Sequence, residues 1–356
     1  MVIRIGAALL AAALLVPPAD VHAAVDYKIV TASERGTYIR IGQDLAMHVA
    51  PAADINLEAV PSAGSVENVQ RLRFEPGVKL ALVQSDVYQG YLDMADRGNP
   101  SAATIIRPLR VIMPLYNEEI YFLARADSPL DFVHEIRGTK INAGELGSGT
   151  ALTSATLYRL MFGENLPESG TSYFTNEDAL VKLIGERTVD VVAIVAGQPA
   201  KLLVDMKPEA RKLIKLLKVD PEHATTKAAL SSYFPATVRA ASYPNLLTDD
   251  LPAVAVKAFL VTYDFDPRAT GAHLRRFAQA LCENFLTLQE KGHPKWREVD
   301  LALPDLGKGW SYYRVTEREL RNCRSTVQRA PRRPGAPGPG RACSQHEMIL
   351  GLCRPG

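Results

Sequence analysis

The sequence predicts an α/β protein of roughly two domains, and three observations lead to this fold class. Apolar, strand-like runs alternate with helix-like segments along most of the chain, which is typical of a parallel-type sheet covered by helices. The chain has 356 residues, enough for about two domains. Apolar residues make up 47% and charged residues 22%, a composition typical of a folded globular protein.

The composition also excludes several classes of protein. There are 41 Lys and Arg against 39 Asp and Glu, so the net charge of +2 lacks the excess of a chain that binds nucleic acid along its whole length. Four cysteines in a chain of this length do not make a small disulfide scaffold. Only one apolar run approaches membrane length, and therefore we expect no polytopic membrane protein.

That apolar run predicts an export leader over residues 1–23. Arg4 precedes twelve unbroken apolar residues, Ile5 to Val16, and Val21-His22-Ala23 then ends in the small residue of a cleavage site. The alternative is a membrane anchor, but twelve residues fall short of the ~20 that span a bilayer. We expect cleavage after Ala23 and a mature protein in an oxidising compartment, most simply a bacterial periplasm.

The first part of the mature chain shows the alternation clearly. Apolar patterning predicts strands at 27–31, 55–60 and 78–84. Between them, Ile41, Leu45 and Val49 recur at a spacing of four, which predicts a helix over 38–49. A further helix is expected to open at Ser65, where Glu67 brings acidic capping chemistry to the first turn.

The alternation continues to about residue 288. Further strands are expected at 109–115, 119–126, 140–143, 189–195 and 254–262, and helices at 150–161, 178–186 and 270–288. The leucine-rich segment 212–219 fits either a strand or a helix.

The end of the chain changes composition and carries three of the four cysteines. From Arg329 to Arg341 it is rich in Pro, Gly and Arg, so we expect residues 326–356 to form a disordered tail. Cys282 and Cys323 are one candidate disulfide pair, and Cys343 and Cys353 are another. Sequence alone leaves the connectivity open.

Three turns that combine glycine with a hydroxyl residue precede predicted helices. They are Arg35-Gly36-Thr37-Tyr38, Ala63-Gly64-Ser65-Val66 and Gly147-Ser148-Gly149-Thr150. The first turn of a helix has unpaired N–H groups and the positive end of the helix dipole, and therefore such a turn suits a carboxylate or phosphate. The alternative is that each Ser or Thr only caps its own helix, but three such turns favour a shared anion cleft.

The sequence offers no catalytic or metal-binding constellation. The glycine turns lack the lysine of a Walker loop and do not fit GxGxxG, and there is no GxSxG elbow. The seven histidines are scattered, and no CxxC or HExxH occurs. We therefore expect no catalytic residue, cofactor or metal.

Several motifs, taken together, resemble the TAXI family of solute receptors for TRAP transporters, a branch of the type II periplasmic binding proteins. GTYIRIG resembles the family's GGTYYPIG, AGSVENVQRL its GGSVENL, and LALVQSDV its ALVQ(S/N)DV. PLYNEE contains the family's LYxE, followed by KINAGELGSGT and then VDVVAIVAGQP, in family order. The resemblance extends from about Tyr27 to Arg314.

This resemblance implies a fold, a function and partners. The fold would be two-lobed, with a hinge and an interlobe cleft; lobe I would comprise residues 24–113 plus 263–325 and lobe II residues 114–262. The protein would close on a small organic anion, a dicarboxylate or an acidic amino acid, and deliver it to a TRAP permease driven by an ion gradient. We expect a monomer.

By position, the resemblance also implies a set of ligand-binding residues. They are Arg35, Gly36, Thr37, Tyr38, Ser65, Val66, Gln84, Ser85, Tyr116, Ser148, Gly149, Thr150 and Gly197. Gln84 and Ser85 would lie at the carboxyl end of a strand, where open α/β sheets place ligands, and Tyr116 would lie at the hinge.

One departure from the family pattern affects the expected ligand. Arg35 replaces the first glycine of GGTYY, so it either enters the cleft and pairs with a ligand carboxylate or points to solvent or to Glu34. Glu67 and Asp86 are candidates for paired acid/base carboxylates, but we favour the alternative in which each caps a helix.

Two rival functions stay open at this point. The same fold suits a receptor that presents its closed form to a sensor kinase instead of a permease. An exported enzyme on this fold would need a placed acid, base or nucleophile, and the sequence identifies none.

Overall fold

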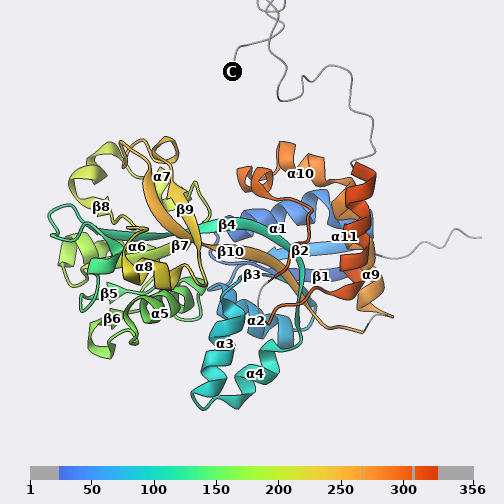
Figure 1. Ribbon diagram of the computed structural model, residues 1–356. Helices are drawn as coiled ribbons and strands as arrows, with labels where there is room; N and C mark the ends of the chain where they lie inside the picture. The colour runs from blue at the N-terminus through green and yellow to red at the C-terminus, as the bar shows by residue number, and fades with distance from the viewer. Residues whose placement is uncertain (1–23, 267, 307–308, 328–356) are drawn as a thin grey trace, which may run out of the picture.

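The computed structural model describes residues 24–266, 268–306 and 309–327, in two groups of elements joined by two long strands (Figure 1). We call the group that holds both ends of the described chain lobe I and the other group lobe II. The expected leader, Cys343, Cys353 and the tail from residue 328 lie outside the described residues. The lobe boundaries at 113/114 and 262/263 stay a prediction.

Lobe I is built from both the beginning and the end of the described chain. Its strands are β1 (Val25–Val30), β2 (Ile55–Val60) and β3 (Val78–Gln84), and the last two have the bounds that apolar patterning predicts. Its helices are α1 (Thr37–His48), α2 (Ser65–Phe74), α3 (Val87–Asp96), α4 (Pro100–Ile106), α9 (Thr270–Glu283), α10 (Phe285–Lys291) and α11 (Arg314–Val327).

Lobe II is the intervening stretch of chain. Its strands are β5 (Ile141–Asn142), β6 (Thr171–Ser172), β7 (Val191–Ala196), β8 (Ile214–Leu216) and β9 (Phe234–Val238). Its helices are α5 (Gly149–Phe162), α6 (Asn176–Val181), α7 (Lys201–Val204) and α8 (Ala224–Ala229). The segment 212–219, which fitted either element, contains a strand.

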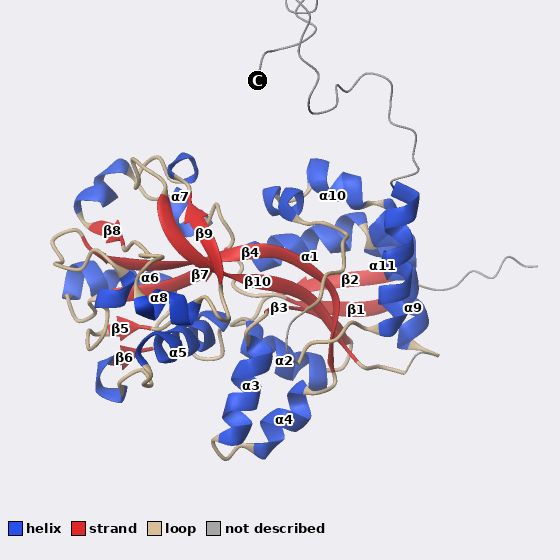
Figure 2. Ribbon diagram, in the orientation of Figure 1, coloured by secondary structure: helices blue, strands red, loops and turns tan. Residues whose placement is uncertain are grey.

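The two long strands, β4 (Leu109–Arg125) and β10 (Leu251–Tyr263), extend into both lobes (Figure 2). The sheet order is β2-β1-β3-β10-β4-β7-β5-β6, with β8 on β4 and β9 on β10. The outer strands pair in parallel, as expected, but β10 is antiparallel to both β3 and β4. The sheet is therefore mixed, and the two-lobed α/β fold is confirmed.

Strand β4 corrects one sequence prediction. The runs 109–115 and 119–126 were expected to be separate strands, because polar residues interrupt the apolar pattern between them. The structure joins them, since Asn117 and Glu118 pair with Lys257 and Val256 of β10. Polar residues in the middle of a buried strand thus hide its continuity.

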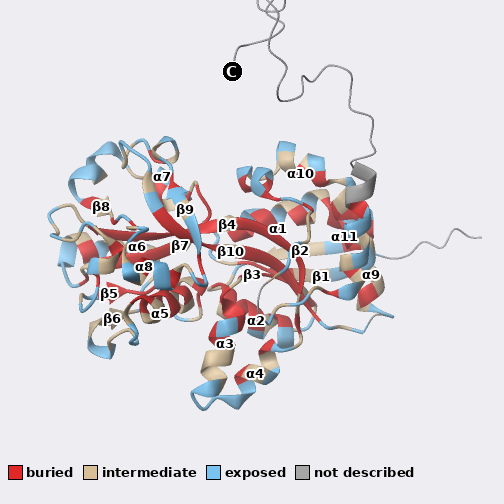
Figure 3. Cartoon of the chain, viewed as in Figure 1, coloured by how far each residue is buried: buried red, intermediate tan, exposed pale blue. Residues whose placement is uncertain are grey.

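Alternate side chains of each central strand pack on opposite faces of the sheet. In β3, Leu80 and Leu82 join one apolar cluster while Ala81 and Val83 join another, as the two-residue period of a strand requires. Helices α1 and α9 cover the first face, and α2 to α4 cover the second. Lobe II repeats this arrangement with two clusters of its own, so the buried residues lie along the sheet in both lobes (Figure 3).

The helical end of lobe I differs from the expected single helix over 270–288. Helix α9 ends at Glu283, and α10 begins at Phe285. The side-chain amide of Asn284 donates a hydrogen bond to the carbonyl of Ala280. Side chains of Asn compete in this way with the backbone N–H groups that continue a helix.

Cys282 and Cys323 form a disulfide that links α9 to α11. No helix within the described ranges is both long and apolar enough to cross a membrane.

Candidate functional site

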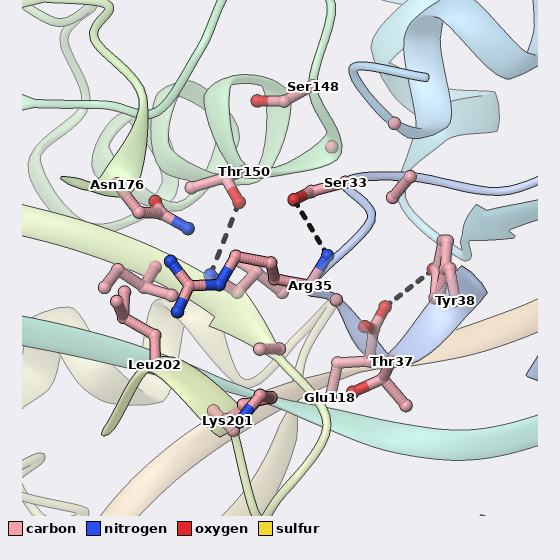
Figure 4. A pocket seen from close by; sticks show the side chains of 18 of the residues that line it. Ser33, Arg35, Thr37, Tyr38, Glu118, Ser148, Thr150, Asn176, Lys201 and Leu202 are labelled. Atoms are coloured by element: carbon pink, nitrogen blue, oxygen red, sulfur yellow. Dashed lines mark hydrogen bonds between the residues drawn. The ribbon is translucent and has the colours of Figure 1, made fainter. Parts of the chain in front are cut away.

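The three glycine turns meet at one cavity between the lobes. Helix α1 begins at Thr37, α2 at Ser65 and α5 at Gly149, and these three residues all line the cavity, whose volume is about 440 Å³. Figure 4 shows Thr37 and, from the start of α5, Ser148 and Thr150 around this cavity. The starts of α1 and α2 come from lobe I, and the start of α5 comes from lobe II. The positive dipole ends of three helices are thus gathered around one space. Two of their first-turn amides are already bonded, Glu67 to the carbonyl of Gly147 and Ala151 to the hydroxyl of Ser148.

Glycine at position 149 allows the lobes to approach closely here. A Cβ atom on Gly149 would lie 1.9 Å from Oε1 of Gln84 and 2.7 Å from Oγ of Ser65, both in lobe I. Gly64, with φ at +130°, lies in the region that favours glycine, and a Cβ there would lie 3.1 Å from the amide nitrogen of Gly149. The two turns therefore pack against each other only because both carry glycine.

The structure brings together nine of the thirteen residues that the resemblance implied. The cavity is lined by Arg35, Gly36, Thr37, Tyr38, Ser65, Gln84, Ser148, Gly149 and Thr150. These residues lie up to 115 positions apart in sequence (150 − 35), and the fold of both lobes is needed to place them together.

Val66 and Ser85 do not line the cavity. Val66 packs against the apolar cluster under α2 and α3, and its carbonyl accepts a hydrogen bond from Tyr91. Ser85 continues the pairing of β3 with β10, since its amide donates to the carbonyl of Lys257 and its hydroxyl accepts from the Lys257 amide. Both residues are used for packing between elements.

Tyr116 and Gly197 also lie outside the lining. Tyr116 is on the crossover strand β4, but its side chain is fully buried in the core of lobe I. Gly197 follows β7 and abuts Tyr116 and Thr37, so a Cβ there would lie 3.1 Å and 3.4 Å from them. Gly197 therefore supports the wall behind Thr37.

Arg35 was expected either to enter the cleft or to point to solvent or to Glu34, and the structure matches neither alternative completely. Its guanidinium lines the cavity yet is 61% exposed, and it reaches across to lobe II instead of to Glu34. It lies 3.5 Å from Glu177 and 3.8 Å from Asp205. Exposed ion pairs contribute only about 0–1 kcal/mol to stability. Arg35 therefore forms a weak ionic contact between the lobes at the rim of the cavity.

The hydroxyl groups of the three turns differ in what they already bind. Ser148 accepts a hydrogen bond from the Ala151 amide, which makes it the N-cap of α5. The Ser65 hydroxyl accepts from the amide of Gln84. The alternative that the hydroxyl only caps its own helix is therefore confirmed for Ser148, whereas the Ser65 hydroxyl binds β3 and makes no cap on α2. Thr37 has no side-chain hydrogen bond within the described ranges, so its hydroxyl remains available.

Sequence reasoning did not select Glu118, which lines the cavity from β4. Its carboxylate is 4% exposed and accepts a 2.6 Å hydrogen bond from the hydroxyl of Tyr38. Burial raises the pKa of Glu118 to about 7, and the nearby charge of Glu119 acts in the same direction. The LYxE motif contained Glu118, but the motif alone did not say that it faces a cavity.

A buried cation behind this wall was also missed. Lys295 is fully buried, and its ammonium binds the carbonyl of Asn117 at 3.0 Å, Glu298 at 2.8 Å and Glu119 at 3.4 Å. The second carboxylate oxygen of Glu119 accepts from the amide of Gln198, at the end of β7. This group links the C-terminal part of lobe I to the crossover strand and to lobe II.

Of the two candidate acid/base carboxylates, Glu67 is a cap as favoured, and Asp86 is not. Glu67 accepts from the amide of Ala63 just before α2. Asp86 makes no side-chain cap and instead accepts from Thr153 and Tyr233 of lobe II, at 2.7 Å and 2.8 Å. Burial raises the pKa of Asp86 to about 6.

Three or more His, Cys, Asp or Glu side chains placed to hold a metal are not found in the described part of the chain. The cavity instead combines helix starts, hydroxyls and one buried carboxyl between two lobes. This arrangement defines a binding protein with the type II periplasmic binding fold, as the strand order and the two crossover strands indicate.

The model of the NMT1-like family matches residues 29–302, and the chain belongs to this family. Among solved structures, it is similar to the periplasmic binding protein BugD, with 14% identity over 85% of this chain and 94% of that one and a TM-score of 0.46. A TctC solute binding protein from Polaromonas has 14% identity over 86% and 98%, with a TM-score of 0.39. The alkanesulfonate-binding protein SsuA from Xanthomonas axonopodis pv. citri, bound to MOPS, has 12% identity over 83% of both chains and a TM-score of 0.43. Likenesses this distant say nothing about the solute of this chain.

Proposed function

We propose that this protein is an extracytoplasmic solute receptor that captures a small organic anion, a dicarboxylate or an acidic amino acid, between its lobes. The observation that carries this proposal is the meeting of the starts of α1, α2 and α5 around one cavity of about 440 Å³. A cavity of this size lies within the range of small-molecule sites, and helix starts favour a negative group.

The mechanism is capture by closure. The solute binds the turn of α1 on lobe I and the turn of α5 on lobe II, so its contacts are complete only when the lobes are together. A ligand with higher affinity for the closed form shifts the population toward that form. The exposed pairs of Arg35 with Glu177 and Asp205 lie at the rim where the lobes meet.

The partner of the closed form would be a TRAP-type membrane permease, as the resemblance to the TAXI receptors implies. The leader-like residues 1–23 support export to the periplasm, where such a receptor acts as a monomer. The permease would recognise the closed receptor, since only that form carries the solute.

The test is native mass spectrometry of the purified mature chain, followed by a thermal-shift screen. A ligand that binds only the folded state raises the melting temperature. At a ligand concentration one hundred times its Kd, the free energy of unfolding increases by ~2.7 kcal/mol. We expect a shift with dicarboxylates or acidic amino acids and none with neutral sugars or diamines. A shift confined to neutral or cationic compounds would overturn the proposal.

A further inference from the structure

Helices α3 and α5, one from each lobe, lie beside each other next to the cavity (Figure 1). Leu152 of α5 packs against an apolar cluster of lobe I, in the space that Gly90 of α3 leaves free, since a Cβ on Gly90 would lie 2.5 Å from Cδ1 of Leu152. Two turns further along the same face of α5, Arg159 forms an ion pair with Asp93 of α3. Their side chains are only 30% and 17% exposed. We call these four residues the α3–α5 seam.

Two further contacts between the lobes flank the seam. Asp86 accepts hydrogen bonds from Thr153 and Tyr233 of lobe II, at 2.7 Å and 2.8 Å. The amide of Glu67 in α2 donates to the carbonyl of Gly147, in the turn before α5, at 3.1 Å. Glu67 is in the first turn of α2, where an amide has no partner within its own helix. The bond of this amide therefore depends on the two lobes being together.

These contacts join protein to protein without any part of a solute. The four seam residues, all within the described ranges, do not line the cavity. The pairs of Arg35 at the rim are exposed and contribute little. Separating the lobes at the seam, in contrast, would expose Leu152 to water and break partly buried bonds. The protein itself therefore supplies free energy for closure.

We propose that the α3–α5 seam makes the closed form the main form of this protein before the solute binds. The solute enters through the minor open form, and its own contacts with both lobes shift the remaining open molecules to the closed form. Leu152, Asp93 and Arg159 are then positioning residues, which set how fast the solute enters and leaves without touching it. This regulation of the cavity rests on the proposed function only for the class of solute.

A closed resting form has a characteristic effect on rates. The seam is the same with and without solute, so weakening it favours opening of the free and of the loaded protein by the same factor. Association and dissociation both become faster, and Kd hardly changes. If the resting form were open, the same change would speed dissociation alone and raise Kd, because the form that admits the solute would already be fully populated.

The first measurement needs no solute: amide hydrogen exchange at Glu67, followed by NMR in the purified chain. We expect this amide to exchange at least about ten-fold more slowly than an unstructured amide. Asp93→Arg places two like charges together at Arg159 and should remove most of this protection, whereas the swap Asp93→Arg/Arg159→Asp should restore it. The amide of Asn68, which bonds to Gly64 within lobe I, should exchange equally in every variant.

Glu164→Arg is the matched control. It makes the same change of charge in the pair Arg137–Glu164, which is exposed and lies within lobe II. Protection of the Glu67 amide should stay within about two-fold of wild type. The proposal is overturned by an unprotected Glu67 amide in the wild type, by equal losses in Asp93→Arg and Glu164→Arg, or by a swap that restores nothing.

The second measurement follows binding of L-glutamate by surface plasmon resonance. We expect Asp93→Arg to raise the association and dissociation rate constants by at least about three-fold each, with Kd within about two-fold of wild type. Faster dissociation alone, with a matching rise in Kd, overturns the closed resting form. If neither L-glutamate nor glutarate binds, the ligand class of the proposed function fails, whereas exchange at Glu67 still decides the role of the seam.

Discussion

The carboxylate of Asp86 in lobe I accepts a 2.8 Å hydrogen bond from the hydroxyl of Tyr233 in lobe II. The hydroxyl of Thr153, also in lobe II, donates to the same oxygen at 2.7 Å, and all three side chains are buried. The other carboxylate oxygen of Asp86 has no partner among the described residues. A buried polar contact thus holds the lobes together beside the cavity without lining it.

Removing the donor on the lobe II side should weaken this contact. Tyr233→Phe leaves one bond fewer to a buried carboxylate, and therefore we expect the free energy of unfolding to fall by about 1–3 kcal/mol. Urea unfolding measures it. Tyr173→Phe, at a tyrosine that is 42% exposed, is the matched control. Equal losses in the two variants would show that the Asp86 contact contributes nothing.

Asp86 should also make stability depend on pH. Its folded-state pKa of about 6 is raised from 3.8 by burial, so the folded protein binds a proton that the unfolded chain releases. Stability from this group is full below about pH 4 and is lost as pH rises through about 6, by roughly 2–3 kcal/mol. Asp86→Asn removes this pH-dependent contribution to stability, because the Asn side chain does not titrate.

The measurement is urea unfolding of wild type and Asp86→Asn at several pH values. The variant should gain stability relative to wild type between about pH 4 and pH 6, and the difference should then be constant. Because other groups titrate equally in both proteins, the difference isolates Asp86. A difference that does not change with pH contradicts the assignment.

Thr37 and Ser148 both line the cavity, but their substitutions should act on different quantities. Thr37→Ala should weaken ligand binding by about 1 kcal/mol or more with little change in stability, since its hydroxyl is uncommitted. Ser148→Ala should lower the unfolding free energy by about 1 kcal/mol, because the hydroxyl caps α5. Calorimetric titration and urea unfolding of both variants separate the effects, and unchanged affinity in Thr37→Ala counts against the assigned cavity.

Replacement of Lys295, the buried cation behind the cavity, should lower the free energy of unfolding more than the other substitutions above. Lys295→Met leaves Glu119 without its ion-pair partner in the protein interior, which typically costs about 3–5 kcal/mol. The double variant Lys295→Met/Glu119→Gln removes both charges and should recover part of this loss. Urea unfolding of both single variants and of the double variant measures these losses. If adding Glu119→Gln to Lys295→Met costs as much stability as Glu119→Gln costs in the wild type, the two side chains are not coupled.

The sequence predicted local elements well where their pattern is apolar and continuous. Strands 55–60 and 78–84 appear with those bounds, because alternating or unbroken apolar residues reflect burial directly. The break at Asn284 and the continuity of β4 were missed. Both depend on polar side chains, whose partners come from elsewhere in the fold.

In the candidate site, too, local patterns were predicted and the roles of buried polar residues were not. The glycine turns predicted helix starts, and the structure gathers all three at one cavity. Glu118, Asp86 and Lys295 were not predicted in their roles, since a charged residue in a sequence usually indicates an exposed surface. Two of the partners of buried Lys295, Asn117 and Glu119, lie nearly 180 positions earlier in the chain.

The position of β10 has a consequence for the order in which the protein is made. This strand, residues 251–263, lies between β3 and β4, both of which are synthesised long before it. Until it emerges, β3 and β4 each present an open, hydrogen-bonding edge, the kind of surface on which unfinished chains aggregate. A chain crossing a membrane amino end first would therefore stay dependent on holding factors until more than two thirds of its length had emerged (263 of 356).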